Sequence, residues 1–315
     1  MGLQITNALN AYIVKEDSYI ERSYVLDFFS YYSANALVDN DELSAIELIN
    51  GELRGVALSD ILIAVTGKSE NIEFRIDKVK APLWQTIYVP KESEIEVKCK
   101  KQSVAYLAIK GLVVENNLVK KALNKEVLQV AYAPKESIVN ELPARRIPAH
   151  IIHEYFNTPL RVIFNHGGMD KRRILFKVER KELLKGIVLN CLEELTGKIK
   201  PQRLKYGALK IGSCIKTLSG KLFVTLNHVT VDGCLIAKIH PCDVDKLVNL
   251  NEGDTVEARV IDHKAYNTVF EHYNNSLQRI KSCIRASINA LKRGAKLVRV
   301  KLGSKVYELW IEEIK

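Results

Sequence analysis

The sequence predicts a mainly β protein with a few helices. Short apolar runs rich in β-branched residues recur along most of the chain and end at Gly, Asn or Asp, which is typical of strands joined by turns. Only residues 24–38 and 266–291 have apolar side chains at the spacing of a helix face. Because successive parallel strands need a crossover helix, the scarcity of helices favours β-barrels or sandwiches over a doubly wound sheet.

The predicted elements run in the following order. The helix at residues 24–38 has Asp27 near its start, and strands follow at residues 61–65 and 95–98. Prolines at several positions from Pro134 to Pro159 remove backbone donors that a sheet would need, so a domain boundary is expected there. Further strands are predicted at residues 160–164, 174–178, 221–226, 234–239 and 255–261. The chain closes with the helix at 266–291, the stop signal Gly294, and a hairpin of residues 296–302 and 305–311.

We expect the chain to form two barrel domains and a C-terminal extension. A chain of 315 residues exceeds the size at which a single core usually stops growing. The predicted parts are a first β-barrel domain at residues 1–140, a second at residues 141–264, and a helix and hairpin at residues 265–315 that pack on the core.

The composition narrows the classes of function. The net charge is +10, but Asp and Glu are interspersed with Lys and Arg and no DNA-binding motif is visible, so no nucleic-acid partner is expected. No apolar run approaches the roughly 20 residues of a membrane helix and no signal segment is visible, which predicts a cytoplasmic protein without a membrane partner. The six scattered cysteines are expected to be reduced thiols. His150 and His153 have helical spacing but lack a carboxylate or Cys partner, so no metal site is predicted.

Four stretches of the chain form an ordered set of motifs. They are Ile13-Val14-Lys15-Glu16-Asp17; Ala34-Asn35-Ala36-Leu37-Val38 with the later Ala64-Val65-Thr66-Gly67; Tyr106-Leu107-Ala108-Ile109-Lys110-Gly111; and Gly207-Ala208-Leu209 with Thr230-Val231-Asp232-Gly233 and Gly253-Asp254-Thr255-Val256. The set covers about residues 13–261 and resembles the KipA family, whose members are 5-oxoprolinase subunits also called allophanate hydrolase subunit 2. It is also similar to the carboxyltransferase domain of urea carboxylase.

The resemblance implies both a fold and a function. The fold would be a pair of cyclophilin-like β-barrel domains. The function would be that of a carboxyltransferase-like subunit of an ATP-dependent 5-oxoprolinase, which opens 5-oxoproline to glutamate with a KipI-type partner and a possible third catalytic subunit. No cofactor is expected to bind this chain directly: ATP would enter through the complex, and biotin would come only on a partner, because no A-M-K-M-like segment is present.

Two other functions stay open. One is biotin-dependent carboxyl transfer to a urea-like or amide acceptor. The other is a non-catalytic scaffold or regulatory partner of the KipI-type subunit. The departures from the family pattern favour the scaffold, because Asn227, Asp232 and Cys234 replace an aspartate, a glycine and a tyrosine in its most chemical motif.

The resemblance also implies the site residues. The predicted catalytic residues are Asn227, Thr230 and Gly233. The hydroxyl of Thr230 and the backbone amide of Gly233 could stabilise a developing oxyanion, whereas the amide of Asn227 can orient a substrate but cannot act as a general base. The predicted substrate-binding residues are Asp17, Asp27, Asn35 and Lys210.

These residues could also serve the fold and not a functional site. The loop from Asn227 to Gly233 could be an inherited tight turn, and Asp27 could simply begin a helix, where a carboxylate meets free backbone amides. Asn35 lies on an apolar helix face, so its amide needs a partner. Gly67 and Gly111 are expected to end strands.

Overall fold

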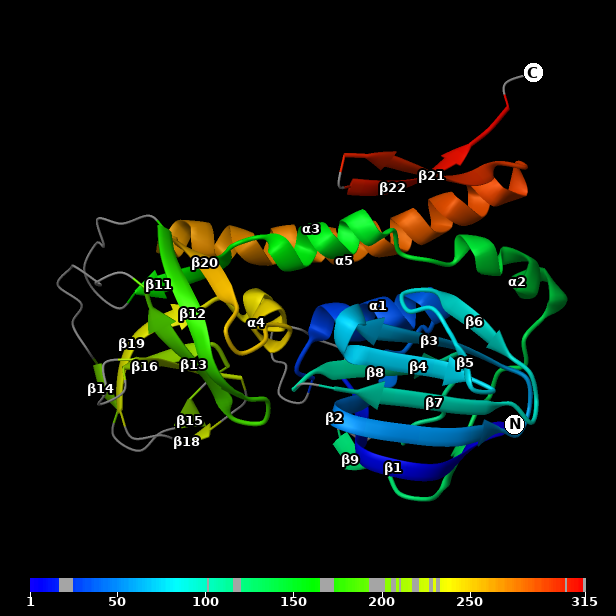
Figure 1. Cartoon of the computed structure of the whole chain (residues 1–315), viewed down its shortest axis with the longest axis horizontal. Helices are drawn as coiled ribbons and strands as arrows, with labels where there is room; N and C mark the ends of the chain where they lie inside the picture. Colours follow the sequence, from blue (N-terminus) through cyan, green and yellow to red (C-terminus); the bar gives the residue numbers. More distant parts are fainter. Residues whose placement is uncertain are drawn as a thin grey trace. The chain divides into compact units, whose positions relative to one another are not determined.

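The mainly β prediction is confirmed. The protein contains a closed seven-strand barrel, a second sheet curled into a half-barrel, and a C-terminal helix and hairpin (Figure 1). The computed structural model describes residues 1–16, 25–100, 102–115, 120–164, 173–192, 202–204, 208–209, 211–216, 221–226, 229–230, 233–303 and 305–313. The chain divides into two compact units, each assembled from segments that are far apart in the sequence. Unit 1 comprises Met1–Asp17, Phe29–Asn157 and Asn275–Lys315, and unit 2 comprises Ser18–Phe28 and Thr158–Asn274.

The curled sheet belongs to unit 1. Its strands are β1 (Gly2–Lys15), β2 (Ser44–Ala57), β3 (Ile61–Gly67), β4 (Ile72–Ile76), β5 (Val79–Lys80), β6 (Thr86–Val89), β7 (Glu94–Cys99), β8 (Val104–Ile109), β9 (Lys120–Ala122) and β10 (Val127–Gln129). The main path runs β5-β4-β7-β2-β8-β3-β6, and β1 pairs with β2, β9 and β10. Side chains alternate between the two faces of each strand. One face therefore holds the hydrophobic core, with Ile46, Leu48 and Leu107 among its fully buried members, while the neighbouring Glu47 and Tyr106 point to the other face.

The helices follow local signals to different degrees. Helix α1 (Phe28–Val38) begins four residues later than predicted, and α5 (His263–Lys292) begins three residues earlier. The proline-rich segment, expected only to mark a boundary, contains α2 (Glu136–Glu141), the 3₁₀ turn η2 (Leu142–Ala144) and α3 (Ala149–Asn157). A second 3₁₀ turn, η1, spans Ser69–Asn71. Pro143 lies in the first turn of η2, where proline costs no hydrogen bond.

The C-terminal hairpin matches its prediction residue for residue. Its strands are β21 (Lys296–Leu302) and β22 (Lys305–Ile311), which pair in antiparallel register. Gly294 has φ of +88° after the end of α5, the left-handed conformation that a helix stop requires.

The closed barrel belongs to unit 2. Its elements are β11 (Leu160–Phe164), β12 (Arg173–Glu182), β13 (Gly186–Cys191), β14 (Gln202–Leu204), β15 (Ala208–Leu209), β16 (Ser213–Lys216), β17 (Leu222–Thr225), β18 (Val229–Thr230), β19 (Gly233–Ile239), α4 (Pro241–Val248) and β20 (Thr255–Val260). The order is β11-β20-β12-β13-β17-β16-β19, and pairing between β11 and β19 closes the circuit. Strand β14 extends the sheet from β19, and β15 pairs separately with β18.

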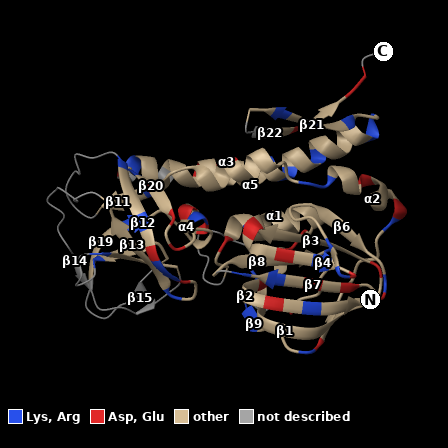
Figure 2. Cartoon of the chain, in the orientation of Figure 1, with Lys and Arg blue, Asp and Glu red and all other residues tan. Residues whose placement is uncertain are grey.

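The described residues also show how charge, apolar helices and cysteines are distributed. Acidic and basic residues are interspersed over the strands of unit 1 (Figure 2). Among the helices that the structure describes, none is both long and apolar enough to cross a membrane. All six cysteines are free.

Candidate functional site

The first candidate, Asn35, is buried, and both the nitrogen and the oxygen of its side chain form hydrogen bonds. Every residue of α1 is buried. The side-chain amide of Asn35 donates to the carbonyl of Tyr31 at 3.0 Å, and its oxygen accepts from the amide of Asn40 at 2.9 Å and from the backbone N–H of Ser44 at 3.2 Å. Asn40 in turn donates to the carbonyl of Ile109 at 3.1 Å. The Asn35–Asn40 pair thus ties the end of α1 to the start of β2 and the end of β8.

Glu47 is a buried carboxylate on the face of the unit 1 sheet that points away from the hydrophobic core. Glu47 is 0% exposed, and its Oε1 accepts a hydrogen bond from the hydroxyl of Tyr106 at 2.7 Å. The ammonium of Lys120 binds its Oε2 and also lies 4.9 Å from the ring centre of Tyr12. Because both oxygens have protein partners, this cluster holds β1, β2, β8 and β9 together.

Unit 2 contains a second buried charge cluster at the start of α4. Asp243 is 0% exposed and accepts hydrogen bonds from Nε and Nη2 of Arg161 at 2.7 and 2.6 Å, and from Nζ of Lys246 at 2.6 Å. Burial by itself would raise the pKa of the Asp243 carboxyl, but the hydrogen bonds of Arg161 and the charge of Lys246 outweigh it and lower that pKa. The carboxyl therefore stays ionised and locks β11 to α4.

Asp27 belongs to another buried network of unit 2. Its Oδ2 accepts a hydrogen bond from the side-chain amide of Asn249 at 2.6 Å. Asp245 accepts from the backbone N–H of Phe28 at 3.1 Å and from the hydroxyl of Tyr273 at 2.7 Å. The carboxylate of Asp245, from a distant part of the sequence, thus binds a backbone amide at the start of α1.

His240 is a buried, neutral imidazole next to these carboxylates. Its Nδ1 accepts a hydrogen bond from the backbone N–H of Cys242 at 3.3 Å, which caps α4. The ring packs between Tyr266 and Phe270, with centroid distances of 4.3 and 4.4 Å. Burial lowers the pKa of His240 to about 4, so the ring is neutral at pH 7.

The structure places only some of the predicted site residues. Asn227, Asp17 and Lys210 lie outside the described residues. Thr230 lies in β18 opposite Ala208, so two of the three segments of the fourth motif stretch pair with each other. Gly233 begins β19 opposite Leu204, which lies outside that stretch. Asp27 and Asn35 are buried within separate polar networks. Their proposed contact with a substrate stays a prediction.

Sequence reasoning did not select His240, Asp243 or Asp245. One local signal was available: His240, Pro241 and Asp243 form a helix start with a cap, a first-turn proline and a first-turn acid. The partners Arg161 and Tyr273 are too distant in sequence for any local pattern to indicate them. No group of three or more potential metal ligands occurs in the part of the chain that the structure describes.

Comparison with known proteins identifies the fold. Residues 20–121 match the model of the carboxyltransferase domain, subdomain A and B. No curated protein matches the chain. Among solved structures, TTHA0988 is similar with a TM-score of 0.61 and 20% identity over 83% of this chain and 55% of that one. The urea carboxylase of Kluyveromyces lactis has a TM-score of 0.62 and 15% identity over 89% of this chain and 29% of that one. The urea amidolyase of K. lactis has a TM-score of 0.61 and 15% identity, again over 89% of this chain but 20% of that one.

These comparisons show the fold of the chain. The chain has a carboxyltransferase-domain fold similar to that of urea carboxylase. It spans about half the length of TTHA0988 and a smaller share of the two yeast enzymes.

Proposed function

We propose that this chain is the carboxyltransferase-like subunit of an ATP-dependent 5-oxoprolinase complex that opens 5-oxoproline to glutamate. The match of residues 20–121 to the carboxyltransferase domain is the observation that carries the proposal, and the ordered motifs that resemble the KipA family supply the substrate. In this proposal the subunit acts with a KipI-type partner, possibly with a third catalytic subunit.

The proposed chemistry divides between the subunits. Hydrolysis of a lactam needs donors for the developing oxyanion and a group that moves a proton. In the proposal, the hydroxyl of Thr230 and the backbone N–H of Gly233 are the donors, and Asn227 orients the substrate. The carboxylates of Glu47 and Asp243 are fully buried and bound by protein groups, so they are poor candidates for the base. The proposal assigns the proton carrier and the ATP site to the partner, and the isolated subunit is expected to be inactive.

A second candidate is biotin-dependent carboxyl transfer to a urea-like or amide acceptor. It is supported by the match to the carboxyltransferase domain and by the similar fold of a protein whose name is urea carboxylase. Because this chain has no biotinylation segment of its own, the carboxybiotin would have to arrive on another protein.

A third candidate is a non-catalytic scaffold or regulatory partner of the KipI-type subunit. It is favoured by the burial of the described candidates Asp27 and Asn35, both of which hold structural hydrogen bonds. The replacement of the family's aspartate by Asn227 points the same way.

One experiment separates carboxyl transfer from the other two functions. The tagged protein is captured from its own cells under native conditions, and the eluate is examined by mass spectrometry and by a streptavidin blot. A KipI-type protein without biotin supports the oxoprolinase or the scaffold, and a biotinylated carrier supports carboxyl transfer. Capture of no partner contradicts all three.

Variants of Asn227 then divide the oxoprolinase from the scaffold. The captured complex is assayed for glutamate formed from 5-oxoproline with ATP. If Asn227 works in the site, Asn227→Ala lowers the rate while Asn249→Ala, at a structural asparagine, acts only through stability. An inactive wild-type complex that gains activity in Asn227→Asp would instead indicate a decayed site, and a complex inactive in every form would refute the oxoprolinase.

A further inference from the structure

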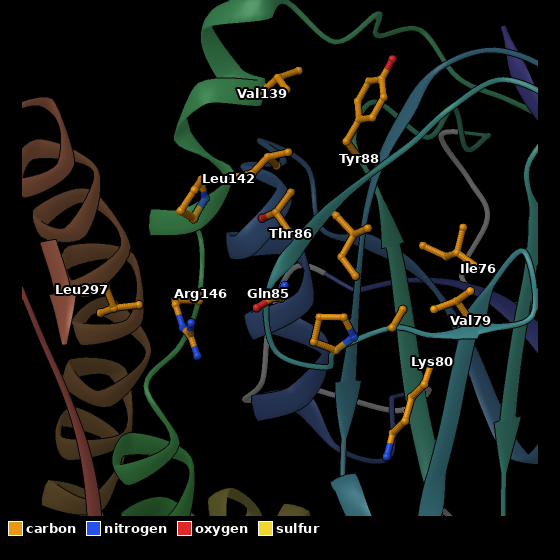
Figure 3. Close-up of a pocket in the computed structure, with 14 residues that line it drawn as sticks. Ile76, Val79, Lys80, Gln85, Thr86, Tyr88, Val139, Leu142, Arg146 and Leu297 are labelled. Atoms are coloured by element: carbon orange, nitrogen blue, oxygen red, sulfur yellow. The ribbon is translucent and has the colours of Figure 1, made fainter. Parts of the chain in front are cut away.

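A groove in unit 1 has the features of a ligand site and lies apart from every residue assigned above. Its cavity volume is about 730 Å³, within the range of roughly 300–1,000 Å³ that small-molecule sites occupy. The walls come from β4 to β6 with their connections, from the α2–η2 segment, and from β21 (Figure 3).

Backbone pairing fixes two polar side chains of this groove beside each other. The backbone N–H of Thr86 donates to the carbonyl of Arg145 at 2.8 Å, and the N–H of Ile147 donates to the carbonyl of Trp84 at 2.9 Å. Gln85 and Arg146 therefore form an antiparallel bridge. Directly opposed residues of such a pair project to the same side with Cβ atoms about 5 Å apart. A carboxamide and a guanidinium are thus held at one place in the wall, as Figure 3 shows.

The groove carries a net positive charge. Arg146 and Lys80 line it, and no Asp, Glu, His or Cys is among its lining residues. Arg146 binds Glu308, but the same carboxylate oxygen also accepts from Nε of Arg299 at 3.0 Å. One carboxylate is therefore shared by two guanidiniums, and the charged side chains that line the groove itself are both basic. In addition, Nε of Arg146 is buried without a hydrogen-bond partner among the described residues.

The neighbouring tyrosine does not offset this charge. The hydrogen bond between the hydroxyl of Tyr88 and Asp60 raises the pKa of Tyr88, so the phenol stays protonated. The combination of a few polar groups with an apolar wall is the usual lining of a small-molecule binding site.

The remaining wall is apolar. Ile76, Val79, Leu142 and Leu297 come from four different elements or turns and line the groove together. Val79 is 71% exposed, a large apolar side chain open to solvent at the edge of the site. Burying such surface under a ligand is favourable by about 25 cal/mol per Å².

We propose that this groove binds a monocarboxylate with an apolar body, of the size and shape of a medium-chain fatty acid. The carboxylate binds the Arg146 guanidinium and the Gln85 amide, whose donors match its two oxygens, and Lys80 adds a second positive charge. The hydrocarbon lies along Val79, Leu142 and Leu297. The inference is independent of the proposed function, because it uses none of the motif residues.

Decanoate is the probe, and the protein's own tryptophans report its binding. The chain has two tryptophans: Trp84 is adjacent to Gln85, and Trp310 pairs with Leu297 across the hairpin. Titration of the full chain with decanoate should change their fluorescence with saturation, and added salt should weaken the binding. Decylamine, which has the same chain and the opposite charge, is expected to bind at least about tenfold more weakly.

Variants locate the site. Arg146→Gln should weaken decanoate binding at least about tenfold, and Lys80→Met several-fold, because each removes a charged contact. The matched control is Lys78→Met, which removes an exposed lysine two residues from Lys80 and should change the affinity less than twofold. If Arg146→Gln disturbs the fold through Glu308, the exposed Lys80→Glu keeps the test valid, since inverted charge should abolish binding. Equal affinities for decanoate and decylamine, equal effects of Lys80→Met and Lys78→Met, or no saturable binding would overturn the proposal.

Discussion

At the scale of single residues, His240 makes the stability of the protein depend on pH. Its pKa is about 4 in the folded state against 6.5 as the ordinary value, and the ring is 0% exposed. Burial is the main cause; the charges of Arg161 and Lys238 add to it, and the carboxylate of Asp243 opposes it. Because the unfolded chain takes up a proton between those two pKa values and the folded chain does not, stability falls as the pH drops through that window.

The expected loss is about 2 to 3 kcal/mol between pH 7 and pH 4.5, at roughly 1.4 kcal/mol per pKa unit. His240→Asn keeps an oxygen that can cap α4 but does not titrate, so its stability should change less over this range. The lowered pKa of Asp243 places its own contribution below about pH 4, outside the window. Urea midpoints at the two pH values measure the effect, with the exposed His153→Asn as control. A pH dependence as steep in His240→Asn as in the wild type would contradict this assignment.

Single residues also show how much of a site the sequence can predict. The need of Asn35 for partners followed from an amide on an apolar helix face, and the structure supplies Tyr31, Asn40 and Ser44. The identity of these partners depends on contacts between distant segments. The same is true of the N–H of Phe28, which binds Asp245 and not a local residue. No periodicity or spacing in a single sequence contains that information.

At the scale of secondary-structure elements, the turn that ends β3 depends on Gly67. Its φ is +133°, and an added Cβ would lie 2.5 Å from the carbonyl oxygen of Val104 and 2.6 Å from a side-chain carbon of Ile72. The Gly67 carbonyl also accepts a hydrogen bond from the indole of Trp84 at 3.0 Å. The strand end cannot shift without disturbing that contact.

Gly67→Ala should therefore lower the free energy of unfolding by about 2 to 5 kcal/mol, the sum of backbone strain and overpacking. Gly294→Ala is the matched control in the same unit, because it has φ of +88° but no heavy atom within 4 Å of the added Cβ. Gly294→Ala should lower the free energy of unfolding by only about 1 to 2 kcal/mol. Urea denaturation of the two variants measures the difference, and losses of equal size would show that crowding at Gly67 is unimportant.

Local patterns predicted the elements whose signals are local. The alternation in β7, the turn of the C-terminal hairpin and the apolar face of α5 each occur within one segment, and each element was found close to its expected bounds. Helices α2 and α3 were missed because prolines there were taken as breakers of regular structure. In fact Pro143 lies within the first turn of η2 and Pro148 immediately precedes α3, positions that proline tolerates.

At the scale of the whole molecule, unit 1 is completed by the end of the chain. The compact unit that holds most of residues 1–140, the predicted first domain, also includes Asn275–Lys315. Three contacts illustrate the connection: Lys281 lies 5.4 Å from the ring centre of Tyr32, Lys292 binds Glu141 at 2.8 Å, and Arg146 binds Glu308. Leu297 adds an apolar contact in the groove wall.

A fragment of residues 1–157 should accordingly be less stable than the same segment within the full chain. Losing the helix end and hairpin exposes apolar surface on α1 and η2, and we expect the free energy of unfolding to fall by at least about 2 kcal/mol. Trp84 is the single tryptophan of the fragment, and Trp310→Phe makes it the single tryptophan of the full chain, so one fluorophore reports both transitions. A separate peptide of residues 275–315 should raise the urea midpoint of the fragment, while a scrambled peptide should not. If residues 1–157 unfold at the midpoint of the full chain and ignore the peptide, the first domain is contiguous and the C-terminal segment only rests on it.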